Sequence, residues 1–69
     1  MPKEIIKLKV NTNDISFVNW ILEGCEHLGV VSTVDREHGI IMIQTTIDMI
    51  DELMPLIENF SFPTIILDE

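Results

Sequence analysis

The sequence predicts one α+β domain whose elements follow in the order β-α-β-β-α-β. The chain has 69 residues, which leaves room for a single domain, and its hydrophobic fraction of 46% is that of a globular protein. Runs that alternate every second residue are separated by runs with a helical period, and short turn segments lie between them. We therefore expect a small two-layer domain with a mixed order of elements.

The first half of the chain predicts a strand and a helix. Residues 4–10 alternate, so that the even-numbered side chains face a core and the odd-numbered ones face away from it. A helix is expected from about Asp14 to His27 or Leu28. Gly29 is expected to end it in the left-handed conformation, because glycine adopts a positive φ without steric cost.

The second half predicts a hairpin, a second helix and a last strand. Gly39 supplies the positive φ of a five-residue loop between two strands rich in β-branched residues. Thr45 or Thr46 is placed to begin the second helix, which contains Pro55 on its polar side. The expected ranges are strands at 30–34, 40–45 and 64–67, the hairpin loop at 35–39, and the helix up to about residue 59.

This order predicts a ferredoxin-like fold, a four-stranded antiparallel sheet with two helices on one face. Each βαβ half needs a right-handed crossover, and that requirement places both helices on the same side of the sheet. All the connections are short, as they are in compact domains of this size.

Charge and cysteine content restrict the classes of function. Four basic residues stand against twelve acidic ones, giving a net charge of −8, which argues against nucleic acid and against an anionic membrane surface. Cys25 is the single cysteine, so no disulfide forms within the chain, and a reducing compartment is expected. The residues after Met1 show no secretory signal, and a cytoplasmic location is therefore expected.

The first helix carries more apolar surface than one sheet face needs. At 100° per residue its apolar arc spans roughly 220°, about twice the width of a stripe that packs on one layer. Aromatic residues dominate interface energetics, and glycine permits close approach of a partner. We expect the excess arc to form an interface, and its residues are Phe17, Trp20, Gly24 and Leu28.

The uncovered sheet face also predicts association. The third strand places apolar groups on both of its faces whichever phase is chosen, and a strand that is apolar on both sides is normally buried on both sides. Ile5 and Met42 are expected to contribute to this second surface. A second layer is expected there, most simply another copy of the chain, which predicts a homo-oligomer such as a dimer.

Residues capable of chemistry do not assemble into a recognisable catalytic motif. Cys25 and His27 diverge by roughly 160° on a helix, so they cannot bind one ion together. Asp48, Asp51 and Glu52 share one side of the second helix and are interpreted as a solvated acidic face. We predict no catalytic residue, no metal site and no cofactor, and hence a protein that is not an enzyme in itself.

The topology and length resemble those of ACT regulatory domains. In that family effectors bind between subunits, close to the loop that follows the first strand. The resemblance implies a small-molecule effector site at Asn11, Thr12, Asn13 and Asp14, although the Gly or Pro-Gly usual in that loop is absent here. The stretches at 21–24 and 28–35, followed by Gly39, look like those of short stand-alone bacterial proteins that are known only as a domain of unknown function.

Two functions therefore follow as expectations. The first is a non-catalytic regulatory or small-ligand-binding domain that acts as a homo-oligomer, with its site near residues 11–14 and a subunit boundary. The second is a protein-protein interaction module, or accessory subunit, that docks through its exposed apolar helix and sheet faces. An activity that arises only at a subunit boundary is a third and weaker alternative.

Overall fold

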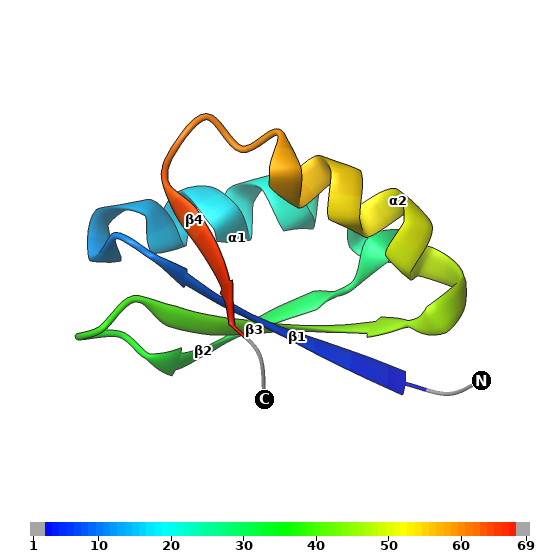
Figure 1. Cartoon of the computed structure of the whole chain (residues 1–69), viewed down its shortest axis with the longest axis horizontal. Helices are drawn as coiled ribbons and strands as arrows, with labels where there is room; N and C mark the ends of the chain where they lie inside the picture. Colours follow the sequence, from blue (N-terminus) through cyan, green and yellow to red (C-terminus); the bar gives the residue numbers. More distant parts are fainter. Residues whose placement is uncertain (1–2, 68–69) are drawn as a thin grey trace.

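The computed structural model describes residues 3–67 and has the predicted order of elements (Figure 1). Two 3-10 turns, η1 and η2, flank the first helix. The elements are β1 (Lys3–Val10), η1 (Thr12–Asp14), α1 (Ile15–Glu23), η2 (Glu26–Leu28), β2 (Val30–Asp35), β3 (Ile40–Thr46), α2 (Ile47–Glu58) and β4 (Thr64–Leu67).

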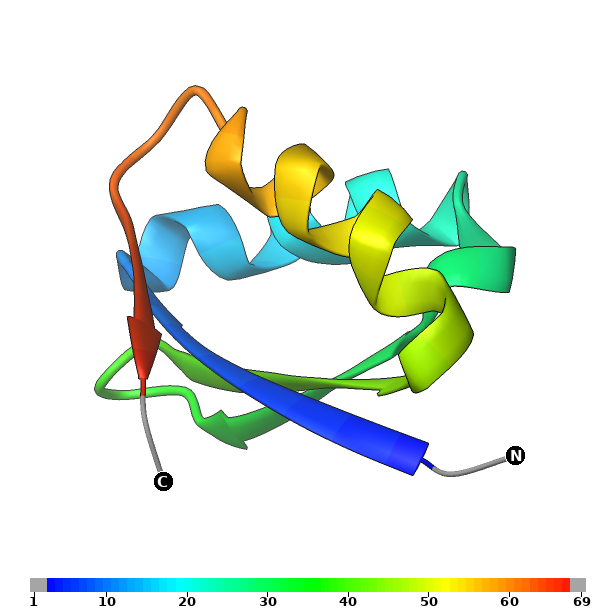
Figure 2. The same cartoon turned by 45° about the vertical axis from the view of Figure 1, so that its right-hand side comes forward.

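The four strands form one sheet in the order β2-β3-β1-β4, and every neighbouring pair is antiparallel. Both helices lie on the same face of this sheet, as two views of the ribbon show (Figure 2). The predicted ferredoxin-like fold class is confirmed, including the single helical layer. No helix within residues 3–67 is long and apolar enough to cross a membrane.

The core lies between the sheet and the helices, and it fixes the phase of each strand. Ile41 and Ile43 point into it from β3, so Ile40 and Met42 lie on the opposite face of the sheet. The even-numbered positions of β1 face the core as predicted. The buried hydrophobic residues are Leu8, Val10, Ile15, Val18, Leu22, Leu28, Ile41, Ile43, Leu53 and Ile57.

The hairpin between β2 and β3 depends on Gly39, whose φ of 70° confirms the predicted left-handed conformation. A Cβ at this position would also overlap the carbonyl oxygen of Val10. The backbone N–H of Val10 donates to the Gly39 carbonyl oxygen at 2.9 Å. The tip of the hairpin is thereby held against the end of β1.

The first helix is shorter than predicted, because it ends at Glu23 and not at His27 or Leu28. Gly24 follows in a helical conformation, and Cys25 then leaves the helical region with φ −130° and ψ 49°. The turn η2 redirects Leu28 into the core, where its exposed fraction is 6%. Periodicity continued past Gly24 in the sequence, and this made the helix look longer than it is.

Gly29 has a role different from the predicted one. Its φ of 165° is extended backbone and not the left-handed cap of a helix. A Cβ there would lie 2.7 Å from the Gln44 carbonyl oxygen and 2.8 Å from Cγ2 of Ile43. Glycine is needed at this position because β3 approaches the backbone closely.

The second helix agrees with the prediction at both ends. Thr46 occupies the N-cap position in an extended conformation, but its side chain makes no capping hydrogen bond. The hydroxyl of Thr45 donates instead to the carbonyl oxygen of Leu28 at 2.6 Å. This bond ties the end of η2 to β3 in the interior. Pro55 lies exposed inside the helix, on the predicted polar side.

Candidate functional site

The most prominent surface feature is a row of aromatic rings across the helical layer. Phe17 and Trp20 lie one turn apart on α1, with ring centroids 5.8 Å apart and planes 18° apart. Phe62 packs on Phe17 with centroids 5.3 Å apart, and Phe60 stacks on Phe62 at 4.9 Å. The chain has one Trp, three Phe and no Tyr, so this aromatic row contains all its aromatic residues.

The aromatic row is buried at one end and open at the other. Phe60 and Phe62, which follow α2, are partly buried against the core. Trp20 is 68% exposed and Phe17 is 39% exposed. Gly24 is also exposed, and a hollow of about 510 Å³ lies beside it, bounded by Trp20, Ile21 and Glu23. An exposed Trp supported by a stacked Phe, next to a residue without a side chain, suits contact with an apolar partner.

The residues predicted to form an interface fall into three places. Phe17, Trp20 and Gly24 lie together on α1, as expected from the helical period. Leu28 does not join them, because the early end of α1 brings it into the core. Ile5 and Met42 lie on the opposite side of the molecule, on the open face of the sheet.

Sequence reasoning missed the contribution of Phe60 and Phe62 to the aromatic row. Their contact with α1 depends on the path of residues 59–63, which return over the first helix before β4 begins (Figure 1). No local pattern shows where such a segment passes. The spacing of Phe60 and Phe62 with a Pro directly after them was the one available signal of an ordered turn.

The loop predicted to bind an effector lies at the surface between β1 and α1. Asn11, Thr12 and Asn13 are exposed and Asp14 is half-buried. The hollow next to this loop has a volume of about 100 Å³ and is lined by Lys9, Val10, Asn11, Pro63 and Ile65. That volume is well below the roughly 300 Å³ at which ordinary ligand pockets begin.

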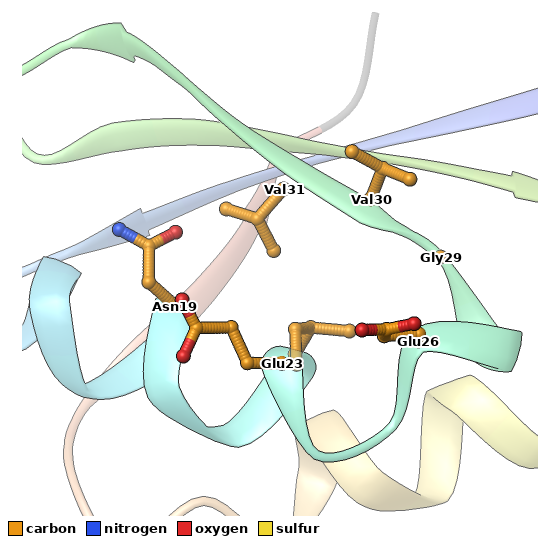
Figure 3. Close-up of a pocket in the computed structure, with 7 residues that line it drawn as sticks. Asn19, Glu23, Glu26, Gly29, Val30 and Val31 are labelled. Atoms are coloured by element: carbon orange, nitrogen blue, oxygen red, sulfur yellow. The ribbon is translucent and has the colours of Figure 1, made fainter.

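A groove larger than the hollow beside this loop runs between α1 and the edge strand β2. Its volume is about 460 Å³. Asn19 and Glu23 stand on the helix side, and Val31 projects toward them from the strand (Figure 3). Glu26 and Gly29 close one end, where the chain turns from η2 into β2. The sequence did not reveal this groove, because a helix extending to residue 28 would have given this segment another path.

The hairpin brings three potential ligand atoms together at the surface. A nitrogen of His38 and carboxylate oxygens of Asp35 and Glu37 lie within 4.8 Å of one another. Nδ1 of His38 lies 2.8 Å from Oδ2 of Asp35, and the backbone N–H of His38 donates to Oδ1 at 3.3 Å. The side-chain hydrogen bond from His38 lowers the pKa of Asp35 below its usual value. These hydrogen bonds account for the cluster as part of the turn.

The two histidines are not neighbours in a shared site. Nε2 of His27 lies 3.6 Å from a carboxylate oxygen of Glu52, which links η2 to α2 at the surface. His38 interacts with Asp35 at the hairpin, at the other end of β2. The structure therefore separates the two side chains, one before β2 and one after it.

Comparison with known proteins identifies the family. A family model described as "Domain of unknown function (DUF4911)" matches residues 8–62. The chain therefore belongs to this family, and the match runs from the last residues of β1 through both helices. Among curated proteins and solved structures, no match was found.

Proposed function

We propose that this protein is a non-catalytic regulatory domain that acts as a homo-oligomer, and that the aromatic row forms the contact between copies. The observation that carries this proposal is the exposure of Trp20, 68%, on a surface where Phe17 holds it in place. A ring fixed by stacking loses little conformational freedom when a partner covers it. Trp is also the residue type most enriched among interface hot spots.

Symmetric pairing through α1 brings together the side of the helical layer that carries the aromatic row, whereas pairing through the sheet brings its lysines together. The open sheet face carries Lys3, Lys7 and Lys9 on one strand, and a second copy stacked on it would bring lysines against lysines. Like charges opposed across an interface cost several kcal/mol, as an order of magnitude. The hollow beside Trp20 is lined, among residues 3–67, by no cation, and its acidic residue is Glu23.

The regulatory role rests on the ACT-like order of elements and on the groove between α1 and β2. Its volume of about 460 Å³ suits a small molecule. Glu23 and Glu26 supply carboxylates on one side, and Val31 supplies apolar surface on the other. This composition favours a ligand with an amine and a short apolar group. The loop from Asn11 to Asp14 stays a predicted effector position, with a smaller hollow beside it.

The proposed setting is the cytoplasm. Cys25 is a free, partly buried thiol, and such thiols are stable in a reducing compartment. The net charge of −8 supports solubility and disfavours nucleic acid and anionic membranes as partners.

Sedimentation equilibrium of the wild type and of Trp20→Ala tests the oligomer. Removal of a hot-spot Trp weakens an interface by about 2 kcal/mol or more, which is roughly thirtyfold in the dissociation constant. Val34→Ala is the matched control, because Val34 is also exposed but lies at the far end of β2. A wild type that sediments as a monomer at every concentration up to 1 mM would contradict the proposal. A dissociation constant of 1 mM corresponds to an association free energy of roughly −4 kcal/mol.

A thermal-shift screen tests the ligand. Primary amines, amino acids and nucleotides are added in turn to the wild type and to a Glu23→Gln, Glu26→Gln variant. A ligand at 100 times its Kd adds about 2.7 kcal/mol to stability, so a bound amine at that concentration raises the melting temperature of the wild type by roughly 10–20 °C. The variant is expected to lose this response. An equal response in both proteins would place the ligand outside the groove.

A further inference from the structure

We propose that the open face of the sheet binds an acidic amphipathic helix of a partner protein. This face is the side of the sheet that the helices leave uncovered (Figure 2). The strand register defines it, because its residues alternate with the buried ones. Its described side chains are Lys3, Ile5, Lys7 and Lys9 from β1, Ile40, Met42, Gln44 and Thr46 from β3, Val30, Ser32 and Asp35 from β2, and Ile65 and Leu67 from β4.

Apolar groups are exposed on each part of this face. Ile5 is 51% exposed, Ile65 58% and Val30 63%, and these three residues come from three different strands. Met42 and Ile40 are half-buried between them on β3. The face therefore presents apolar surface across the width of the sheet and not at one isolated point, which is typical of a binding surface.

Charge differs between the two layers of the molecule, and Asp35, which interacts with His38, is the acidic side chain that the register of residues 3–67 places on the open face. All three lysines of the chain lie on the open face, on a single strand. The helical layer carries exposed acids, among them Glu23, Glu26, Asp48, Asp51, Glu52 and Glu58. In a chain with a net charge of −8, a face that concentrates three of the four cations favours an acidic partner.

A second copy of the chain does not meet these requirements. Stacking two open faces opposes lysine to lysine, as described above. Stacking the open face on the helical layer of another copy brings opposite charges together, but the aromatic row of that layer is the contact proposed above between copies, so this step rests on the proposed function. The rest of that layer, the outer side of α2, offers mainly Asp48, Asp51, Glu52 and Glu58, with Ile47 as its exposed large hydrophobic residue. The partner must combine acidic and apolar groups.

The size of the face fits a helix. Four strands about 4.8 Å apart give a surface wide enough for a helix of about 10 Å diameter, and β1 provides length for several helical turns. The helix would pack on this face as α1 and α2 pack on the other, with its apolar stripe on Ile5 and Met42. Its flanking carboxylates would then reach Lys3 and Lys9, whose side chains are exposed.

A titration followed by ¹H-¹⁵N NMR tests the proposal. The probe is a synthetic amphipathic peptide of about 18 residues with Leu on one face and Glu on both flanks. A matched peptide carries Lys in place of every Glu. We expect the acidic peptide to shift the amide signals of β1 and β3, and the basic peptide to leave them unchanged. The affinity for the acidic peptide should fall as salt is raised.

Charge reversal on the protein provides the second half of the test. Lys3→Glu, Lys9→Glu should weaken binding of the acidic peptide at least tenfold, whereas Arg36→Glu, which changes a cation in the hairpin, should not. Circular dichroism confirms that each variant is folded.

Four results would overturn the proposal. The first two are equal binding of both peptides and shifts that map to the helical layer. The other two are a double variant that binds as tightly as the wild type, and a face that binds anionic vesicles but not the acidic peptide. Trp20→Ala should bind the peptide normally, which separates this surface from the aromatic row.

Discussion

The ring of Trp20 stacks on the ring of Phe17 one helical turn away, with centroids 5.8 Å apart, although most of the indole faces solvent. Stacking of this kind contributes about 0.5–1.5 kcal/mol beyond the burial of area. The pair therefore gives a small domain a rigid apolar projection without enclosing it. The predictions below separate residues that hold the fold together from residues that serve this projection.

Gly29→Ala is expected to destabilise the domain by about 1–3 kcal/mol, because the added methyl overlaps β3 in a packed interior. Its Cβ would lie 2.7 Å from the Gln44 carbonyl oxygen. Gly24→Ala is the control, since its Cβ would meet the Ile21 carbonyl oxygen at an ordinary 3.5 Å. We expect that variant to be neutral or about 0.4–1 kcal/mol more stable. Urea unfolding measures both, and equal losses at the two glycines would contradict the packing of η2 on β3.

Thr45→Val is expected to cost about 1–3 kcal/mol, because it leaves the Leu28 carbonyl oxygen without its donor inside the core. Thr45 is 5% exposed, and its hydroxyl donates to the Leu28 carbonyl oxygen at 2.6 Å. Thr33→Val makes the same chemical change at an exposed position of β2, where the effect should stay within about 0.5 kcal/mol. Thermal unfolding of the two variants provides the comparison. A Thr45→Val protein as stable as Thr33→Val would show that this bond contributes nothing.

His38→Ala is expected to raise the pKa of Asp35 toward its usual value, because it removes the side-chain hydrogen bond that lowers that pKa. A carboxyl whose pKa is lower in the folded state stabilises the fold above its unfolded-state pKa. This contribution is lost as the pH falls through the lower, folded-state pKa. Since the site is exposed, the effect on stability is small and the carboxyl signal is the better observable. A ¹³C NMR titration measures it, and an unchanged pKa in the variant would refute the assigned cause.

Local signals in the sequence were sufficient for the order of elements. Gly39 marked the hairpin through its positive φ, and Thr46 marked the start of α2 through its position before a helical run. The alternation of residues 4–10 also gave the correct faces of β1. Each of these features depends on neighbours within a few residues, which is why the sequence alone reveals them.

Features that depend on distant contacts were predicted less well. Gly29 was predicted to end α1, but the helix ends at Glu23, and the path that follows depends on how closely Gly29 approaches β3 and on the bond between Thr45 and Leu28. The groove between α1 and β2 follows from that path. The aromatic row likewise needed Phe62 to pack on Phe17, which lies far from it in the sequence.

The central claim is that copies of this chain meet at the aromatic row, and the protein carries its own reporter of that contact. Trp20 is the single tryptophan of the chain, so its emission reports on that one surface. Fluorescence spectra recorded over a dilution series from millimolar to nanomolar concentration should shift to longer wavelength as the oligomer dissociates and the indole enters water. The shift should share its midpoint with the loss of mass in sedimentation. An emission maximum that stays at the position of exposed tryptophan, while the mass still changes with dilution, would place the contact elsewhere and contradict the account.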